Sequence, residues 1–177
     1  MADREELKVF GATVLGFAQA CVNLSIVAGS KAASLVGDIE PTGWYPFELL
    51  RQVERTVLES YENAAPIMER VGMQMMLTWY DPGPGKEIIQ RGVDFLHFQT
   101  GSQGYASVVQ GPKTVVGSFS LTEIDEKNGK AVIHSTTPFD KDLERGIIIG
   151  GMKAPGDLDY IDVNNDEDRQ CFKIEFH

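Results

Sequence analysis

The sequence is poor in the residues on which small disulfide-bonded and zinc-binding domains depend. Its 177 residues include two cysteines, Cys21 and Cys171, and three histidines. Without a Cys-x-x-Cys pair, the chain has neither a disulfide framework nor a cysteine-rich zinc site. The two thiols are therefore expected to be reduced, as in a cytoplasmic protein.

Positive charge is also scarce. The chain has 16 Lys and Arg residues against 26 Asp and Glu residues, a formal net charge of -10. Such a molecule repels polyanions, and no cluster of Lys or Arg accompanies an amphipathic segment. Nucleic acid and an anionic membrane surface are therefore not expected as partners.

The chain has no long uninterrupted apolar run near its start. Residues 1–6 are acidic where a secretory signal is basic, and the apolar stretch that follows is broken by Gly11, Gly16, Gln19 and Asn23. We expect neither a signal peptide nor a membrane span.

Several signature motifs of enzymes are absent. The chain has no Gly-x-Gly-x-x-Gly, no Gly-x-x-x-x-Gly-Lys-Ser/Thr, no Gly-x-Ser-x-Gly and no His-Glu-x-x-His. One of the three histidines is the C-terminal His177, which leaves few candidates for histidine-based catalysis. The favoured interpretation is a binding protein.

The composition that is present is typical of a globular domain. Hydrophobic residues make up 42% of the chain and charged residues 24%. A chain of this length buries roughly two-thirds of its surface without help from a metal or a disulfide. We expect a single ligand-binding domain over residues 1–177.

Apolar residues recur at three- and four-residue spacing in the first half, which is typical of amphipathic helices. The predicted helices cover residues 12–28, 46–61, 63–80 and 86–98. Pro46 suits a first helical turn, and Asn63 is expected to cap the third helix. The stretch from Thr100 to Tyr105 is glycine-rich and is either a loop or a frayed continuation of the fourth helix.

The second half has the pattern of strands. A strand within 114–124 leads to Asn128-Gly129, a favoured hairpin turn, and a return strand over 131–136. A helix begins at Asp140 and ends at Gly150-Gly151. Strands over 158–163 and 171–176 follow. Helices followed by a mostly antiparallel sheet, without alternating βαβ units, predict an α+β fold.

Two features suggest a ligand site. The methionines Met68, Met73, Met75 and Met76 lie near Trp79 on one predicted helix, where they line either an adaptable pocket or an ordinary core. His97 lies between Leu96 and Phe98, where an imidazole is either an axial iron ligand or a hydrogen-bonded core residue.

Several segments together resemble the heme-nitric-oxide/oxygen-binding (H-NOX) sensor domains over nearly the whole chain. They are the opening 10–16, the stretch 63–72 followed by Thr78-Trp79-Tyr80, the segment 96–99, and the C-terminal segments 144–147 and 171–176. The same outline is shared by 4-vinyl-reductase-like domains and TRAPP vesicle-tethering subunits. The resemblance implies N-terminal helices packed on a C-terminal sheet, with hydrophobic ligands held between them.

The resemblance also implies a role for His97, which matches the histidine that coordinates heme iron in H-NOX domains. Those domains hold the heme propionates with a Tyr-x-Ser-x-Arg motif. Here the corresponding residues are Ile133, Ser135 and Thr137, so that only the serine is kept. Without Tyr and Arg, the charged end of a heme lacks its bidentate partner.

Three hypotheses follow. The first is a non-enzymatic sensor or regulatory module that binds a hydrophobic ligand, with heme as the specific version. The ligand is expected in an apolar cavity between the helices 46–61 and 63–80 and the sheet, against Met68, Met75, Trp79 and Phe98, with His97 at or near its wall.

The second hypothesis is a TRAPP-like adaptor that binds proteins through an exposed apolar patch. The third is an enzyme that acts on a tetrapyrrole-like or aromatic compound. A module that senses a ligand must pass its state to a signalling partner, and twofold self-association is the commonest assembly, so we also expect a homodimer.

Overall fold

The computed structural model describes residues 6–177. Most of the acidic segment 1–6, on which the expectation of no signal peptide rests, lies outside this part of the chain. Within residues 6–177, no helix combines the length and the apolar character that crossing a membrane requires.

The helices and strands follow one another from Lys8 to Phe176. The helices are α1 (Gly11–Asn23), α2 (Gly29–Leu35), α3 (Phe47–Leu58), α4 (Ala65–Tyr80), α5 (Gly85–Ile88), α6 (Gly92–Thr100), the 3-10 helix η1 (Tyr105–Ser107), α7 (Lys113–Val116) and α8 (Lys141–Lys153). The strands are β1 (Lys8–Phe10), β2 (Trp44–Pro46), β3 (Val109–Gln110), β4 (Phe119–Asp125), β5 (Lys130–Ser135), β6 (Ile161–Asn165) and β7 (Cys171–Phe176).

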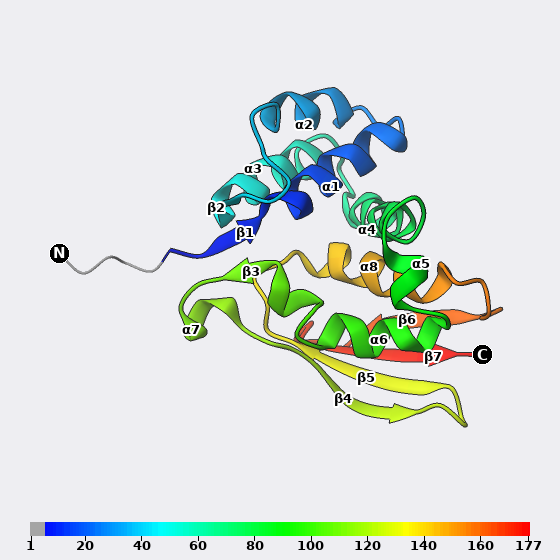
Figure 1. The fold of residues 1–177 in the computed structure, drawn as a ribbon. Helices are drawn as coiled ribbons and strands as arrows, with labels where there is room; N and C mark the ends of the chain where they lie inside the picture. The colour runs from blue at the N-terminus through cyan, green and yellow to red at the C-terminus, as the bar shows by residue number, and fades with distance from the viewer. Residues whose placement is uncertain (1–5) are drawn as a thin grey trace.

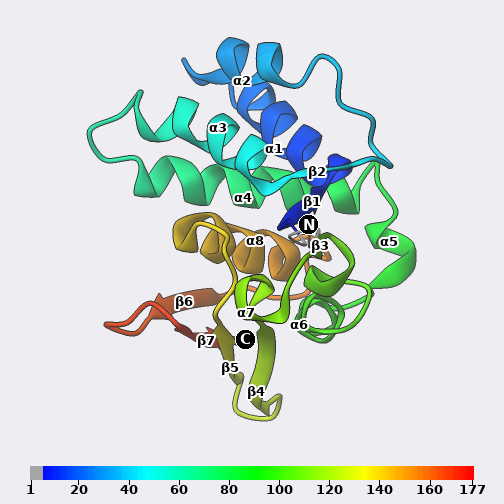
Figure 2. The ribbon, with the colours of Figure 1, turned by 90° about the vertical axis from the view of Figure 1, so that its left-hand side faces the viewer.

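These elements stack in layers. The main sheet has the order β4-β5-β7-β6 with every neighbouring pair antiparallel. Helices α6 and α8 lie against the sheet, α4 packs on α8, and α1 to α3 lie beyond α4 (Figure 1; Figure 2 gives the view from the side). The predicted α+β fold, with N-terminal helices over an antiparallel C-terminal sheet, is confirmed.

The helix at 46–61 forms nearly as predicted. Pro46 lies at the N-terminal boundary of α3, and the buried Phe47, Leu50 and Val53 follow at three-residue spacing. The helix at 12–28 is shorter than predicted, because α1 ends at Asn23 and Ser25 has a φ of 53°. A left-handed residue cannot continue a right-handed helix. The chain instead starts the separate helix α2, which was not predicted.

The third and fourth predicted helices also need correction. Ala64, not Asn63, precedes the first turn of α4, and it makes no side-chain cap. The helix predicted over 86–98 is two helices, α5 and α6, separated by an extended Arg91. The Asp94 carboxylate accepts a hydrogen bond of 2.8 Å from the Arg91 amide, and this cap starts α6 afresh.

The hairpin predicted around Asn128-Gly129 is confirmed. Strand β4 pairs with β5 through a bulge at Thr122. In β5 every second residue is buried, and these are Ala131, Ile133 and Ser135. The strand predicted within 114–124 is β4, which begins at Phe119, while Thr114 lies in the short helix α7.

A second, smaller sheet was not predicted. Its order is β2-β1-β3, with Val9 opposite both Tyr45 and Val109. It joins the beginning of the described chain to the segment that follows α6. Strands of two or three residues are too short to display a period of two, so they leave little signal in the sequence.

Helices α4 and α8 cross with their backbones in close contact. A Cβ atom added at Gly72 of α4 would lie closer than 3.0 Å to the Leu143 carbonyl oxygen of α8. A Cβ added at Gly146 would meet the Glu69 carbonyl oxygen in the same way, and Gly150 is similarly crowded by α4. Glycine is therefore required where the two helices cross.

Candidate functional site

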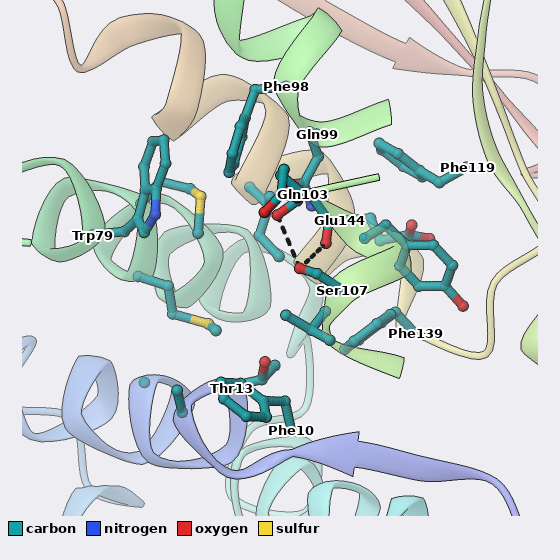
Figure 3. Close-up of a pocket in the computed structure, with 18 of the residues that line it drawn as sticks. Phe10, Thr13, Trp79, Phe98, Gln99, Gln103, Ser107, Phe119, Phe139 and Glu144 are labelled. Atoms are coloured by element: carbon teal, nitrogen blue, oxygen red, sulfur yellow. Dashed lines mark hydrogen bonds between the residues drawn. The ribbon is translucent and has the colours of Figure 1, made fainter. Parts of the chain in front are cut away.

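A cavity of about 420 Å³ lies between α1, α4, α6, η1, β4 and α8. Its lining is mainly apolar. The aromatic residues of the lining are Phe10, Trp79, Phe98, Tyr105, Phe119 and Phe139. Figure 3 shows Trp79 and Phe98 on one side of this space and Phe119 and Phe139 on the other. The volume falls within the range of about 300–1,000 Å³ typical of small-molecule sites.

The wall formed by α4 and α6 is a packed aromatic surface. The rings of Trp79 and Phe98 stack with centroids 5.0 Å apart and an interplanar angle of 26°. Trp79 also meets Phe95 edge to face, with centroids 5.9 Å apart. Pairs of this kind add about 0.5–1.5 kcal/mol to what area burial contributes. This wall is therefore stabilised by contacts between its own side chains.

The opposite wall is a second aromatic group. Tyr105 lies edge to face with Phe139, with centroids 5.7 Å apart, and its ring is 6.1 Å from that of Phe119. The Tyr105 hydroxyl donates a hydrogen bond to the Val116 carbonyl oxygen. This bond points the hydroxyl at the backbone of α7, and Tyr105 still contributes to the lining of the cavity.

Three of the four predicted ligand-binding residues line this cavity. They are Met75, Trp79 and Phe98. Met68 does not, because it lies two turns before Met75 and is fully buried in the core. The cavity borders only the last turns of α4.

The predicted position of the cavity also needs correction. Its lining includes Ala12, Thr13, Gly16 and Gln19 of α1 but no residue of the helix at 46–61. The reason is that α1 packs on α4 beside the cavity, whereas α3 lies behind the lining, where its Phe47 packs on Phe139 with ring centroids 5.3 Å apart. The wall assigned to α3 is therefore formed by α1.

His97 does not lie at the wall of this cavity. Its side chain is 54% exposed, and its Nε2 atom is 4.0 Å from a carboxylate oxygen of Glu126. It borders a separate surface hollow with Thr100 and residues of β4. Successive residues of a helix point about 100° apart, so that Phe98 faces the cavity and its neighbour faces away. The prediction that His97 lies at the wall is wrong.

The main polar feature of the cavity is Glu144 of α8, which was not predicted. This residue is 4% exposed, yet it contributes to the lining. The Ser135 hydroxyl lies 2.9 Å from its Oε1 and 3.0 Å from its Oε2. The Lys141 ammonium donates to Oε1 at 2.6 Å. A buried carboxylate is thus held by one cation and one hydroxyl.

The surroundings of Glu144 alter its ionisation and that of its neighbour. Burial raises the pKa of Glu144, while Lys141 and the hydroxyl of Ser135 act to lower it. Burial also raises the pKa of the Tyr105 phenol, and the charge of Glu144 adds to this effect. Because the charge of Glu144 raises the pKa of Tyr105, Glu144 is assigned to the Tyr105 end of the cavity.

A signal for Glu144 is present in the sequence. It lies three residues before Ile147 and four before Ile148, so a charge falls on the apolar face of the helix. A carboxylate on such a face needs a buried partner, and Lys141 is one turn away.

Neither the Cys21 thiol nor a metal-binding cluster adds reactive chemistry among residues 6–177. Burial raises the pKa of the Cys21 thiol to about 12, which leaves little reactive thiolate. Among residues 6–177, no group of three or more His, Cys, Asp or Glu side chains is arranged to hold a metal ion.

Comparison with known proteins addresses the fold. No protein-family model matches the sequence, and no curated protein matches it. Among solved structures, an oxygen-binding H-NOX domain related to soluble guanylate cyclases is similar, with 18% identity, 94% of each chain covered and a TM-score of 0.65.

Two further H-NOX structures are similar to this chain over nearly its whole length. A variant of the T. tengcongensis H-NOX domain matches with 19% identity over 94% of this chain and 96% of that chain, with a TM-score of 0.63. A structure from work on heme distortion in the H-NOX family matches with 19% identity over 94% and 95% of the two chains, also with a TM-score of 0.63. The chain therefore has an H-NOX-like fold over nearly its whole length.

Proposed function

We propose that this chain is a non-enzymatic sensor or regulatory module, a single ligand-binding domain over residues 1–177, whose ligand occupies the cavity between α1, α4, α6 and α8. The observation that carries the proposal is the cavity itself, which is lined by apolar and aromatic side chains with a few polar groups. Such a lining suits an apolar ligand with a small number of polar anchors.

The alternatives receive less support. A TRAPP-like adaptor would bind through an exposed apolar face, and the exposed Val22, Val27 and Leu35 offer one, but this hypothesis gives the cavity no role. An enzyme acting on an aromatic compound would need a positioned acid, base or nucleophile. Among the described residues of the lining, the titratable side chains are Glu144 and Tyr105, and the Tyr105 hydroxyl is bonded to the backbone. We favour binding over catalysis.

Heme is the ligand that the similarity to H-NOX domains suggests, since related structures are described in terms of heme and its redox potential. The residues present do not fit heme in the manner that the resemblance implies. His97 points away from the cavity, and the lining contains no histidine or cysteine among the described residues. The Ser135 hydroxyl is hydrogen-bonded to Glu144. The cation beside Ser135 is Lys141, whereas the H-NOX motif has an arginine that binds a propionate.

The cavity can be tested by filling it. A Cβ atom added at Gly16 would have one neighbour within 4 Å, the Met75 methyl group at 3.7 Å, so a Gly16→Leu side chain can extend into the space. Gly37→Leu is the matched control, because no atom lies within 4 Å of an added Cβ there. Native mass spectrometry and visible spectra of the purified proteins report any bound ligand. We expect Gly16→Leu alone to lose it.

Two results decide the outcome. If a ligand co-purifies equally with the wild type and Gly16→Leu, it binds elsewhere and the proposed site is wrong. Titration with hemin tests heme separately, and we expect no Soret band that depends on His97. A saturable band that His97→Ala removes would instead assign heme to this chain, with His97 as the iron ligand.

We also propose that the module forms a homodimer and passes its state to a signalling partner. The apolar side chains of Val22, Val27 and Leu35 are exposed near α2, which supports a contact with another chain. Light scattering at micromolar concentration tests the dimer, and a monomer mass there would contradict it.

A further inference from the structure

We infer that the cavity selects apolar ligands that carry a cationic or hydrogen-bond-donating group and discriminates against carboxylates. The inference rests on the proposed function, because it concerns the ligand of the same cavity. Its basis is the hydrogen bonding of Glu144, Lys141 and Ser135 at the Tyr105 end.

The Glu144 carboxylate has acceptor capacity to spare. An ionised carboxylate has about four lone-pair sites. Oε1 accepts from Lys141 at 2.6 Å, and the single hydroxyl proton of Ser135 is shared between Oε1 at 2.9 Å and Oε2 at 3.0 Å. Oε2 therefore shares its hydroxyl donor with Oε1, and the Thr137 hydroxyl also acts on the carboxyl group by lowering its pKa. A donor group of a ligand would add a hydrogen bond to the lone pairs that remain.

Lys141, in contrast, has no donor to spare. Its ammonium carries three protons. It contacts the Glu144 Oε1 at 2.6 Å, the Ser135 hydroxyl at 2.9 Å, and the carbonyl and hydroxyl oxygens of Thr137 at 3.2 and 3.3 Å. Lys141 does not itself line the cavity. The cation of the pair thus lies outside the lining, with 18% of its side chain exposed, while its anion, 5% exposed, is in the lining.

The rest of the lining gives an anion no charged partner. Among the described residues around the cavity, none is Lys, Arg or His. The other polar side chains are neutral, and include Gln19, Gln99 and Gln103. A ligand carboxylate would lose its hydration and meet Glu144, whereas an ammonium would gain a charge-assisted hydrogen bond.

Three probes with one ring system test this selection. They are 2-naphthylmethylamine, 2-naphthylmethanol and 2-naphthoate, titrated calorimetrically into the whole chain at pH 8. We expect the amine to bind about tenfold or more tighter than the carboxylate, with the alcohol between them. If the carboxylate binds as tightly as the amine, the inference about selection is wrong, but the cavity remains the proposed ligand site. If none of the three binds, the proposed ligand site is wrong as well.

Variants locate the selection at Glu144. Glu144→Gln removes the charge and should cancel the preference for the amine while keeping the affinity for the alcohol within about threefold. Glu175→Gln makes the same change on an exposed position of β7 and should leave all three affinities unchanged. An amine preference that survives in Glu144→Gln would refute the assignment.

Glu144→Gln leaves Lys141 without its counter-charge, and this change could unfold the protein. The double variant Lys141→Met with Glu144→Gln removes both charges and provides the second test. It should bind the alcohol and show no preference between the amine and the carboxylate. A retained preference in the double variant would also overturn the inference.

Discussion

Glu54 of α3 is a buried carboxyl group whose effect on stability depends on pH. It is 6% exposed, and its Oε1 atom has no hydrogen-bond partner among the described residues. Burial raises its pKa to about 8, the charge of Asp140 adds to the increase, and Arg51 opposes it. The folded protein therefore favours the neutral form of this side chain.

The size of the effect follows from the difference between the folded and unfolded states. The pKa is about 8 in the folded protein, against 4.5 for a glutamate side chain that is not buried. Since the folded value is raised, the folded state binds more protons between these limits, and stability falls as pH rises from about 4.5 to about 8. The loss at pH 7 is about 3 kcal/mol at 1.36 kcal/mol for each pKa unit.

Glu54→Gln tests this reasoning, because glutamine has the same shape and cannot ionise. We expect the variant to be more stable than the wild type by about 3 kcal/mol at pH 7 and nearly equal to it at pH 4.5. The measurement is the free energy of unfolding from urea titrations at several pH values. Glu144 also has a raised pKa, so the difference between the two proteins is needed to isolate Glu54.

The outcome is decided by the dependence on pH. A constant difference between Glu54→Gln and the wild type from pH 4.5 to pH 8 would refute the raised pKa of Glu54. Glu59→Gln is the matched control, because Glu59 follows α3 at an exposed position, and it should leave the dependence on pH unchanged.

Three further substitutions test other features. Gly16→Ala should raise the melting temperature, because a methyl group fits there and alanine favours α1 by about 0.5–1 kcal/mol. Gly146→Ala should lower the free energy of unfolding by about 1–3 kcal/mol, because its Cβ would overlap the Glu69 carbonyl of α4; an unchanged value in urea would contradict the close crossing. Ser135→Ala should destabilise the protein by about 1–3 kcal/mol, because it removes a donor from the buried Glu144, and a neutral result by calorimetry would show that the hydroxyl is dispensable.

The sequence predicts those parts of the fold that depend on long periodic patterns. Helix α3 and the hairpin around Asn128-Gly129 are examples, because apolar spacing and turn chemistry agree there. The small sheet and α2 were not predicted. Their strands and turns are too short for a period to show, and their positions depend on contacts with distant segments.

The ligand site is less predictable than the fold. Met75, Trp79 and Phe98 could be identified because aromatic and methionine residues are typical of apolar cavities. The orientation of His97 could not, because α6 is apolar on more than one face. Phe95 and Leu96 are buried in the core, while Phe98 borders the cavity. Asp94, His97 and Thr100 do recur at three-residue spacing on one side, but the apolar residues on both flanks of that side obscure the pattern.

The close crossing of α4 and α8 limits how the protein can respond to a ligand. At Gly72 and Gly146 the two backbones touch with no side chains between them to rearrange, so neither helix can slide or rotate without a backbone clash. We therefore expect the two helices to move together. A ligand larger than the cavity must displace α1 or the segment from α6 to η1 instead. Any ligand-dependent change in shape is thereby directed to the side of the domain where α1 and the small sheet meet.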